Sequence, residues 1–298
     1  NHAQQGQVIL GTDSHTCSVG AVGAFADGIG ATEMAGAWLT GDVRIKVPAT
    51  WRFNLKGKLN EGVMAKDVML SILSDQKIKS SQAVSKVFEF AGKSLCDWTF
   101  DEIFVLPNMS VEGGAFTGIV EPKQSRTYDS NVSFESDPDA QFEEVFNINL
   151  SKIVPMVATP GDPRNGIPIS EAVGTKTDAV YIGSCTGGKF NDLLAVAKIL
   201  KNKKVKVPTY IQASSMNVRK QAEESGLIRI FEDAGAEVID SGCGDCCNMG
   251  FGVVKDGQTI VSDTNRNFPK RMGNNNVYLV NPEFAAIAAI KGELSSSI

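Results

Sequence analysis

Three of the chain's six cysteines fall within five residues, in the segment GCGDCC at 242–247. Cys243 and Cys246 have the C-x-x-C spacing that can place two sulfurs on one metal centre, and a third thiol, Cys185, follows another apolar run. Thiolates are the soft ligands that suit iron–sulfur clusters and zinc. Other interpretations stay open. Cys243 and Cys246 could form a redox pair, zinc could take the three thiols with His15, and Cys185 taken alone could be a small buried residue.

A second group of side chains could exchange protons and bind carboxylates. Asp13 and His15 stand two residues apart in GTDSHT, and a carboxylate beside an imidazole can orient it as an acid or base. The plainer interpretation is a capped turn. Arg266 and Arg271, in NRNFPKR, could clamp carboxylates or could be two solvated surface arginines. Glu112, before a Gly pair, is by itself typical of a surface or helix-end position.

The composition excludes several classes of protein. Apolar residues make up 42% and charged residues 21%, and the net charge of −5 comes with no basic stripe for nucleic acid. No run approaches 18 apolar residues, so no membrane span is predicted. Six cysteines in 298 residues are too few for a disulfide scaffold, which indicates a reducing compartment such as the cytoplasm or an organelle matrix. Gly28 and Gly30 lack the third glycine of a dinucleotide fingerprint.

The elements that must position these residues alternate between strand and helix patterns. We expect strands at 7–11, 49–59, 178–183, 207–214 and 236–240, and helices at 65–73, 189–200 and 218–235. This order predicts α/β layering with a mostly parallel sheet, in which ligand groups gather at the carboxyl ends of strands. The loops TDSHT, SCTGG and GCGDCC each follow a predicted strand, so all three could contribute to such a site. The polar segment 123–147 is predicted to be a linker or surface excursion.

Five motifs give the chain a family resemblance. GTDSHT, NMSVEGGA, IGSCTGG, GCGDC and TNRNF occur here in the order seen in the aconitase superfamily, over roughly residues 5–294. Within it, the chain most resembles the large subunit of 3-isopropylmalate dehydratase and its homoaconitase-like relatives. The resemblance implies three-layer α/β/α domains with mostly parallel sheets. We expect residues 1–46 to be the C-terminal part of a first domain whose N-terminal part is absent, 47–150 a second, and 151–298 a third that carries the cysteines.

The resemblance also implies a cofactor and a reaction. A [4Fe–4S] cluster would be held by Cys185, Cys243 and Cys246, with one iron open to the substrate as a Lewis acid. The implied enzyme is a hydro-lyase that isomerises a hydroxy di- or tricarboxylic acid by dehydration and rehydration. Interconversion of 3- and 2-isopropylmalate, in leucine biosynthesis, is favoured over the reactions of aconitase, homoaconitase or methylmalate-type dehydratases. The alternative is a non-catalytic zinc or redox protein on the same fold.

The remaining roles follow residue by residue from the resemblance. The implied catalytic residues are His15, Asp13 and Glu112, the substrate-binding residues are Ser14, Arg266 and Arg271, and Asn108 and Asn265 surround the cluster. A small swivelling-domain subunit, in a heterodimer or heterotetramer, would supply the base that abstracts a proton. Two features depart from the family pattern: its upstream Asp–His pair is missing, and Cys247 is an additional cysteine.

Overall fold

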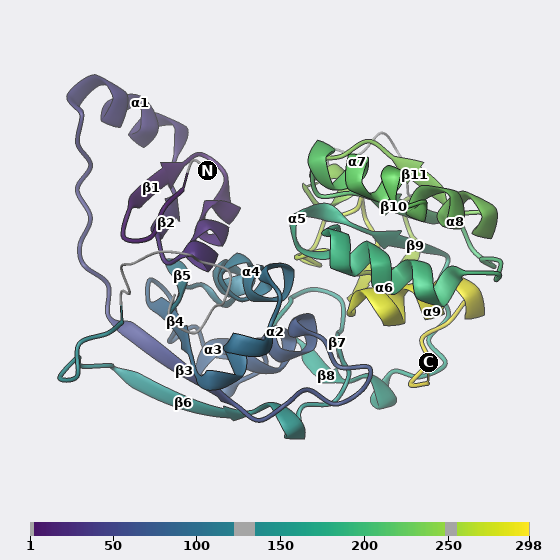
Figure 1. The fold of residues 1–298 in the computed structure, drawn as a ribbon, viewed down its shortest axis with the longest axis horizontal. Helices are drawn as coiled ribbons and strands as arrows, with labels where there is room; N and C mark the ends of the chain where they lie inside the picture. Colours follow the sequence, from purple (N-terminus) through teal and green to yellow (C-terminus); the bar gives the residue numbers. More distant parts are fainter. Residues whose placement is uncertain (1–2, 122–134, 248–254, 298) are drawn as a thin grey trace. The chain divides into compact units, whose positions relative to one another are not determined.

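The structure is a computed structural model that describes residues 3–121, 135–247 and 255–297 (Figure 1). Contacts divide the chain into two compact units. The first comprises Asn1–Leu59 and Gln76–Lys152, and the second comprises Asn60–Asp75 and Ile153–Ile298. The predicted division into three domains stays a prediction. No helix in the described part of the chain is long and apolar enough to cross a membrane.

The first unit contains two parallel sheets. One pairs β1 (Val8–Gly11) with β2 (Phe25–Gly28), and the other has the strand order β5-β4-β3-β6. The strands of this second sheet are β3 (Thr50–Lys56), β4 (Val87–Ala91), β5 (Thr117–Val120) and β6 (Glu144–Asn149). Alternate residues of β3 are buried, as its sequence predicts, and Phe53 stacks on Phe146 with ring centroids 4.8 Å apart.

The helices of the first unit are short. The α-helices are α1 (Ala31–Thr40), α3 (Gln76–Lys79) and α4 (Phe100–Asn108), and the 3₁₀ helices are η1 (Ser14–Val22), η2 (Lys93–Asp97), η3 (Met109–Gly113) and η5 (Leu150–Lys152). The predicted linker 123–147 is wrong at its end, because residues 144–147 belong to β6, which pairs along β3. Residues 123–134 of that prediction lie outside the described residues.

The second unit is built on a seven-stranded sheet of order β11-β10-β9-β12-β13-β7-β8. The parallel strands are β9 (Ala179–Ile182), β10 (Thr209–Gln212), β11 (Glu237–Ile239), β12 (Thr259–Ser262) and β13 (Asn276–Leu279). The strands β7 (Met156–Ala158) and β8 (Gly166–Pro168) add an antiparallel edge. The helices are α2 (Ala65–Leu73), α5 (Ser184–Gly187), α6 (Phe190–Leu200), α7 (Met216–Glu224), α8 (Leu227–Ala234) and α9 (Pro282–Lys291).

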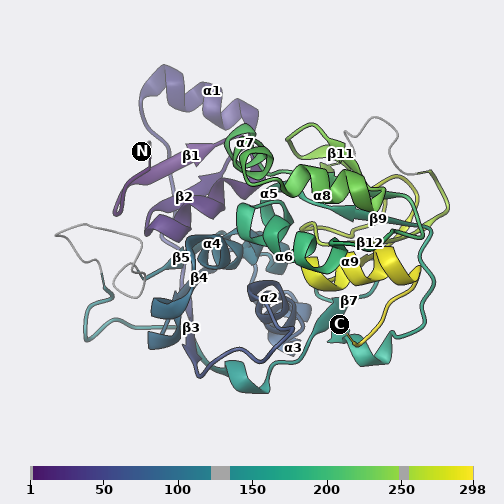
Figure 2. The same cartoon turned by 45° about the vertical axis from the view of Figure 1, so that its right-hand side comes forward.

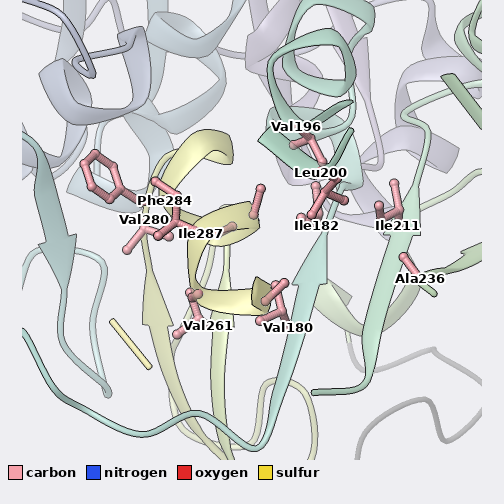
Figure 3. Close-up of a cluster of buried hydrophobic side chains, with 14 of the residues drawn as sticks. Val180, Ile182, Val196, Leu200, Ile211, Ala236, Val261, Val280, Phe284 and Ile287 are labelled. Atoms are coloured by element: carbon pink, nitrogen blue, oxygen red, sulfur yellow. The ribbon is translucent and has the colours of Figure 1, made fainter. Parts of the chain in front are cut away.

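The core of the second unit lies between one face of this sheet and α6 to α9 (Figures 1 and 2). Val180 and Ile182 of β9 point to this face and gather with Leu200 of α6 and Ile287 of α9 (Figure 3). Because side chains alternate along a strand, Tyr181 between them points to the opposite face. The segment that carries three cysteines meets Tyr181 on that opposite face.

The sequence predicts one continuous helix over 218–235, and this prediction is wrong. The chain forms two helices, α7 and α8, separated by Ser225 and by Gly226, which has a left-handed φ of 75°. A glycine adopts this conformation at little cost, so it ends one helix and redirects the chain into the next. The helix predicted at 65–73 is confirmed with the same bounds as α2.

Candidate functional site

Asn265 is the residue where two of the three predicted cysteine ligands meet. Its Oδ1 lies 3.5 Å from Sγ of Cys185 and 3.8 Å from Sγ of Cys246, and it accepts a hydrogen bond of 3.0 Å from the hydroxyl of Ser184. The three segments involved follow β9, β11 and β12, which are parallel strands of one sheet. The prediction that SCTGG and GCGDCC meet at the carboxyl ends of strands is therefore confirmed at Asn265.

The segment that carries Cys185 has a strained backbone, and a hydrogen bond to a buried carboxylate helps to hold it. Ser184 has a φ of 66° although it is not a glycine, and it is almost fully buried. Non-glycine residues adopt this region at a cost of about 1–3 kcal/mol, and surrounding contacts must hold them there. One such contact is the hydrogen bond of 2.7 Å that the backbone N–H of Gly183 donates to Oδ1 of Asp263.

Gly244 lets the GCGDCC segment approach the sheet. A Cβ atom at this position would lie 2.0 Å from the hydroxyl of Tyr181, and the backbone φ of 51° is left-handed. The Tyr181 hydroxyl accepts from the backbone N–H of Asp245 at 3.4 Å and donates to Oε1 of Gln212 at 2.8 Å. Burial raises the pKa of Tyr181, and the nearby Asp245 carboxyl adds to that rise. Only glycine therefore fits at position 244 without moving the segment away from Tyr181.

The other predicted residues of this segment differ in exposure. Cys246 is buried, Cys243 is exposed, and the backbone N–H of Cys246 donates to the carbonyl of Cys243 at 3.2 Å. Cys247 is half-buried and directs its thiol to the carbonyl of Gly244 at 3.3 Å, away from the contacts that Asn265 makes. Arg271 lies against the same segment, because its Nη1 is 3.5 Å from the carbonyl oxygen of Cys246.

Arg266 directly follows Asn265 and is half-buried. Its neighbour Asn265 is fully buried and donates through Nδ2 to the hydroxyl of Thr186. Arg266 is thus next to Asn265 in the chain, whereas Arg271 contacts the cysteine segment directly.

Several charged residues close to Asn265 in the structure are buried, and the sequence did not predict their burial. Lys66 of α2 donates through Nζ to the carbonyls of Asp263, at 3.0 Å, and Thr264. Lys189 donates to the carbonyl of Thr186 and lies 3.8 Å from Asp192. Burial raises the pKa of the Asp263 carboxyl well above its ordinary range, the hydrogen bond from Gly183 and the charge of Lys66 oppose that rise, and the charge of Asp192 adds to it. Charged residues at the start of an amphipathic helix normally signal exposure, so no sequence pattern marked Lys66 as buried.

The predicted acid–base group lies in the first unit. His15 Nε2 is 2.9 Å from Oε1 of Glu112, whose side chain is 0% exposed, and the ring itself is 10% exposed. A carboxylate only accepts, so it orients the ring and favours a proton on Nε2. Of the two positions that the local sequence of Glu112 favoured, the surface position is wrong, because the residue is buried, and the helix-end position is right, because η3 ends at Gly113. The contact joins the two residues that the family resemblance pairs, and their catalytic role stays a prediction.

Asp13 and Ser14 begin the 3₁₀ helix that carries His15. Oδ1 of Asp13 accepts the backbone N–H of His15 at 2.7 Å and lies 4.0 Å from Nδ1 of its ring. The Asp13 side chain is 66% exposed, and Ser14 is exposed as well. The capped turn is therefore confirmed. The Asp13 carboxylate is too far from the imidazole for a hydrogen bond, and the ring contacts Glu112 instead.

Asn108 supports this segment from the end of α4. Its Nδ2 donates to the hydroxyl of Ser18 at 2.8 Å, and its backbone carbonyl lies 3.7 Å from Sγ of Cys17. Gly20 brings the same helix against β5, since a Cβ atom there would lie 1.7 Å from the carbonyl oxygen of Gly118. The absence of a side chain at Gly20 thus permits this close packing.

The cysteine group suits an iron–sulfur cofactor in the chemistry of its donors. Two thiols contact one amide oxygen, and a third thiol lies three residues away on the same segment as one of them. Within residues 3–121, 135–247 and 255–297, no three His, Cys, Asp or Glu side chains converge closely enough to hold a single metal ion. Thiols are the soft donors that hold iron–sulfur clusters and zinc, so the residues present fit an iron–sulfur cluster by the chemistry of their donor atoms.

Comparisons with known proteins identify the family of the chain. The model of the aconitase family (aconitate hydratase) matches residues 1–292. The chain is 41% identical, over 99% of its length and 72% of the relative's, to the probable 3-isopropylmalate dehydratase large subunit of Methanothermobacter thermautotrophicus. It is 40% identical to the 3-isopropylmalate dehydratase large subunit of Clostridium kluyveri, with 98% and 71% covered.

A solved structure has the same fold. The crystal structure of Thermococcus kodakaraensis aconitase X in its holo-form superposes with a TM-score of 0.62 at 16% identity, covering 97% of this chain and 70% of that one. The predicted α/β aconitase-like fold with mostly parallel sheets is confirmed. The family model, the relatives and this fold lead to one conclusion: the chain belongs to the aconitase family.

Proposed function

We propose that this chain is the large subunit of an iron–sulfur hydro-lyase that interconverts 3-isopropylmalate and 2-isopropylmalate by dehydration and rehydration. The observation that carries the proposal is the contact of Cys185 and Cys246 thiols with the same Asn265 oxygen. The identity of 37–41% to relatives named 3-isopropylmalate dehydratase large subunit supports the choice of substrate.

Three thiols of the second unit would hold the cofactor. Cys185, Cys243 and Cys246 are the proposed ligands of a [4Fe–4S] cluster, and Asn265 lies against two of them. When bound, a cluster with one iron that lacks a protein ligand supplies Lewis-acid chemistry to the substrate hydroxyl. Arg271, held near the carbonyl of Cys246, and Arg266 have the planar guanidinium groups that bind carboxylates.

Proton handling is assigned to His15 and Glu112 of the first unit. Glu112 is buried and fixes the imidazole at Nε2, which leaves one ring orientation for exchange of a proton at the hydroxyl that leaves or returns. Asp13 holds the backbone of His15, and exposed Ser14 is the proposed substrate contact. The base that abstracts the carbon-bound proton is proposed to come from a small swivelling-domain subunit.

Anaerobic purification and reconstitution test this proposal. The chain is purified with and without a co-expressed small subunit, its iron and sulfide are measured, and hydration of the unsaturated intermediate is followed with isopropylmalates, citrate, homocitrate and methylmalate as comparison substrates. We expect a broad absorption band from the cluster in both samples, and fast turnover of isopropylmalate only with the small subunit. Stoichiometric zinc in a colourless chain, or full activity of the chain alone, would contradict the proposal.

A further inference from the structure

Lys66 carries a buried ammonium group for which the proposed reaction has no direct use. The residue is 3% exposed, and Nζ donates to the carbonyl oxygens of Asp263, at 3.0 Å, and Thr264. These carbonyls belong to the two peptide groups that immediately precede Asn265. An ammonium that binds two successive carbonyls restrains both peptide planes, and so restrains the direction in which the next side chain leaves the backbone.

The segment 263–265 connects this lysine to both cysteine-bearing segments. At one end, Oδ1 of Asp263 accepts the backbone N–H of Gly183, two residues before Cys185. At the other end, Oδ1 of Asn265 contacts the thiols of Cys185 and Cys246. A shift of this segment would therefore move the oxygen on which the two thiols converge.

The Lys66 ammonium interacts with two buried carboxyls. Its positive charge lowers the pKa of both the Asp263 and the Asp67 carboxyl, against the rise that burial causes in each. Moving a lone ammonium out of water costs several kcal/mol, so a lysine in this position depends on such partners and on well-formed hydrogen bonds. Its geometry is correspondingly well defined.

We propose that Lys66 is a positioning residue for the cysteine junction, defined as Cys185, Cys246 and Asn265. It acts through the carbonyls of residues 263 and 264 and sets the place of the Asn265 amide. The inference rests on the function proposed above, in which the two cysteines hold a cluster, but one of its tests does not require the cluster.

The test compares Lys66→Met with a matched variant, Thr177→Val. The buried hydroxyl of Thr177 also donates to two backbone carbonyls, those of Ala179 at 2.8 Å and Thr259 at 3.1 Å, but at the amino ends of β9 and β12. Both changes remove a buried donor to backbone carbonyls of the second unit and nearly preserve side-chain volume. A loss of stability alone would therefore affect the two variants in the same way.

Two measurements are made on the full chain at a temperature where both variants are folded. The first is the rate at which iron is lost to a chelator, with the visible circular dichroism of the cluster as a second signature. Residues that orient metal ligands typically contribute 10–100-fold to metal affinity, so we expect about tenfold or greater acceleration of iron loss in Lys66→Met and little change in Thr177→Val. Equal rates in the two variants would overturn the inference.

The second measurement uses the cluster-free chain. Alkylation of Cys185 is followed by peptide mass spectrometry, with Cys96 of the first unit as the internal reference. Lys66→Met should raise the rate at Cys185 severalfold and leave Cys96 unchanged, because the Asn265 amide no longer rests against the thiol. If the wild-type chain binds no iron, the proposed function fails, while this measurement still decides the role of Lys66.

A double-mutant cycle tests the route through Asn265. In an Asn265→Ala background, Lys66→Met should add little to the alkylation rate of Cys185, because the amide that Lys66 positions is absent. Additive effects of the two changes would contradict a positioning role. Should Lys66→Met fail to fold, Lys66→Gln keeps one amide donor without the charge and should give an intermediate alkylation rate; a wild-type rate in that variant would refute the proposal.

Discussion

Oε1 of Glu112 lies 2.9 Å from Nε2 of His15, although 97 residues separate them in the chain. The contact forms because η1, which carries His15, packs against both α4 and η3, and Glu112 belongs to η3. The Glu112 side chain is fully buried and the imidazole is nearly so. A carboxylate in this position accepts from Nε2 and restricts the ring to one orientation.

Glu112→Gln should lower kcat and change KM little. The amide preserves the side-chain volume but replaces one acceptor oxygen by a donor, so it holds the imidazole less firmly than the carboxylate does, and a positioned acid or base contributes about 10²–10⁴-fold to rate. The measurement is steady-state hydration of the unsaturated intermediate by the chain with its small subunit. Glu232→Gln, at an exposed position of α8, is the matched control and should retain full activity. A folded Glu112→Gln enzyme with wild-type kcat would refute the role of this pair.

Separate serine substitutions should divide the cysteines into ligands and a bystander. Cys185→Ser, Cys243→Ser and Cys246→Ser each remove a proposed ligand and should abolish most of the iron and sulfide in the purified chain. Cys247→Ser should keep both, because the Cys247 thiol points to the carbonyl of Gly244. Iron retained by Cys246→Ser but lost from Cys247→Ser would show that the register of ligands is shifted by one residue.

Much of the second unit could be predicted from local patterns. The strand and helix periodicities that bracket Cys185 and Cys246 place both at strand ends, and a parallel sheet then brings such ends to one edge. The break between α7 and α8 was missed because a glycine inside a helical pattern can be tolerated as well as end it.

Long-range contacts explain what the sequence could not reveal. Lys66 and Asp67 begin a correctly predicted helix, yet both are buried, because residues 60–75 belong to the second unit while their neighbours in the chain belong to the first. The partnership of Glu112 with His15 likewise depends on how η1 packs against η3, and no local spacing encodes it. The family motifs indicated that pair; residue chemistry alone did not.

Asp67 should make the second unit lose stability as pH rises through the weakly acidic range. Burial raises the pKa of its carboxyl from 3.8 to about 6, despite hydrogen bonds from Asn281 and from the backbone N–H groups of Met64 and Met156. Between these two pH values the folded state keeps a proton that the unfolded state has released. The free energy of unfolding therefore falls across that window, by about 3 kcal/mol at most, and the loss is complete above pH 6.

Urea unfolding of the cluster-free chain at pH 4 to 7 checks this expectation against Asp67→Asn. The asparagine does not titrate, so the wild-type stability minus that of the variant should decrease as pH rises from 4 to 6. Other carboxyls, including Asp263, are present in both proteins and largely cancel in the difference. A difference that is constant, or that increases with pH, would show that the Asp67 pKa is not raised in the folded chain.

Gly20→Ala should destabilise the first unit and impair His15 together. The new Cβ would lie 1.7 Å from the carbonyl oxygen of Gly118, so η1 and β5 must separate, at a cost of about 1–3 kcal/mol or more.

Gly36→Ala is the matched control, because Gly36 is exposed within α1 and has no neighbouring atom within 4 Å of its would-be Cβ. Alanine there should be neutral or stabilise the helix by up to about 1 kcal/mol. Thermal unfolding and kcat are measured for both variants. Since η1 also carries His15, a Gly20→Ala chain that lost stability but kept its full kcat would mean that the His15–Glu112 geometry does not depend on this close packing.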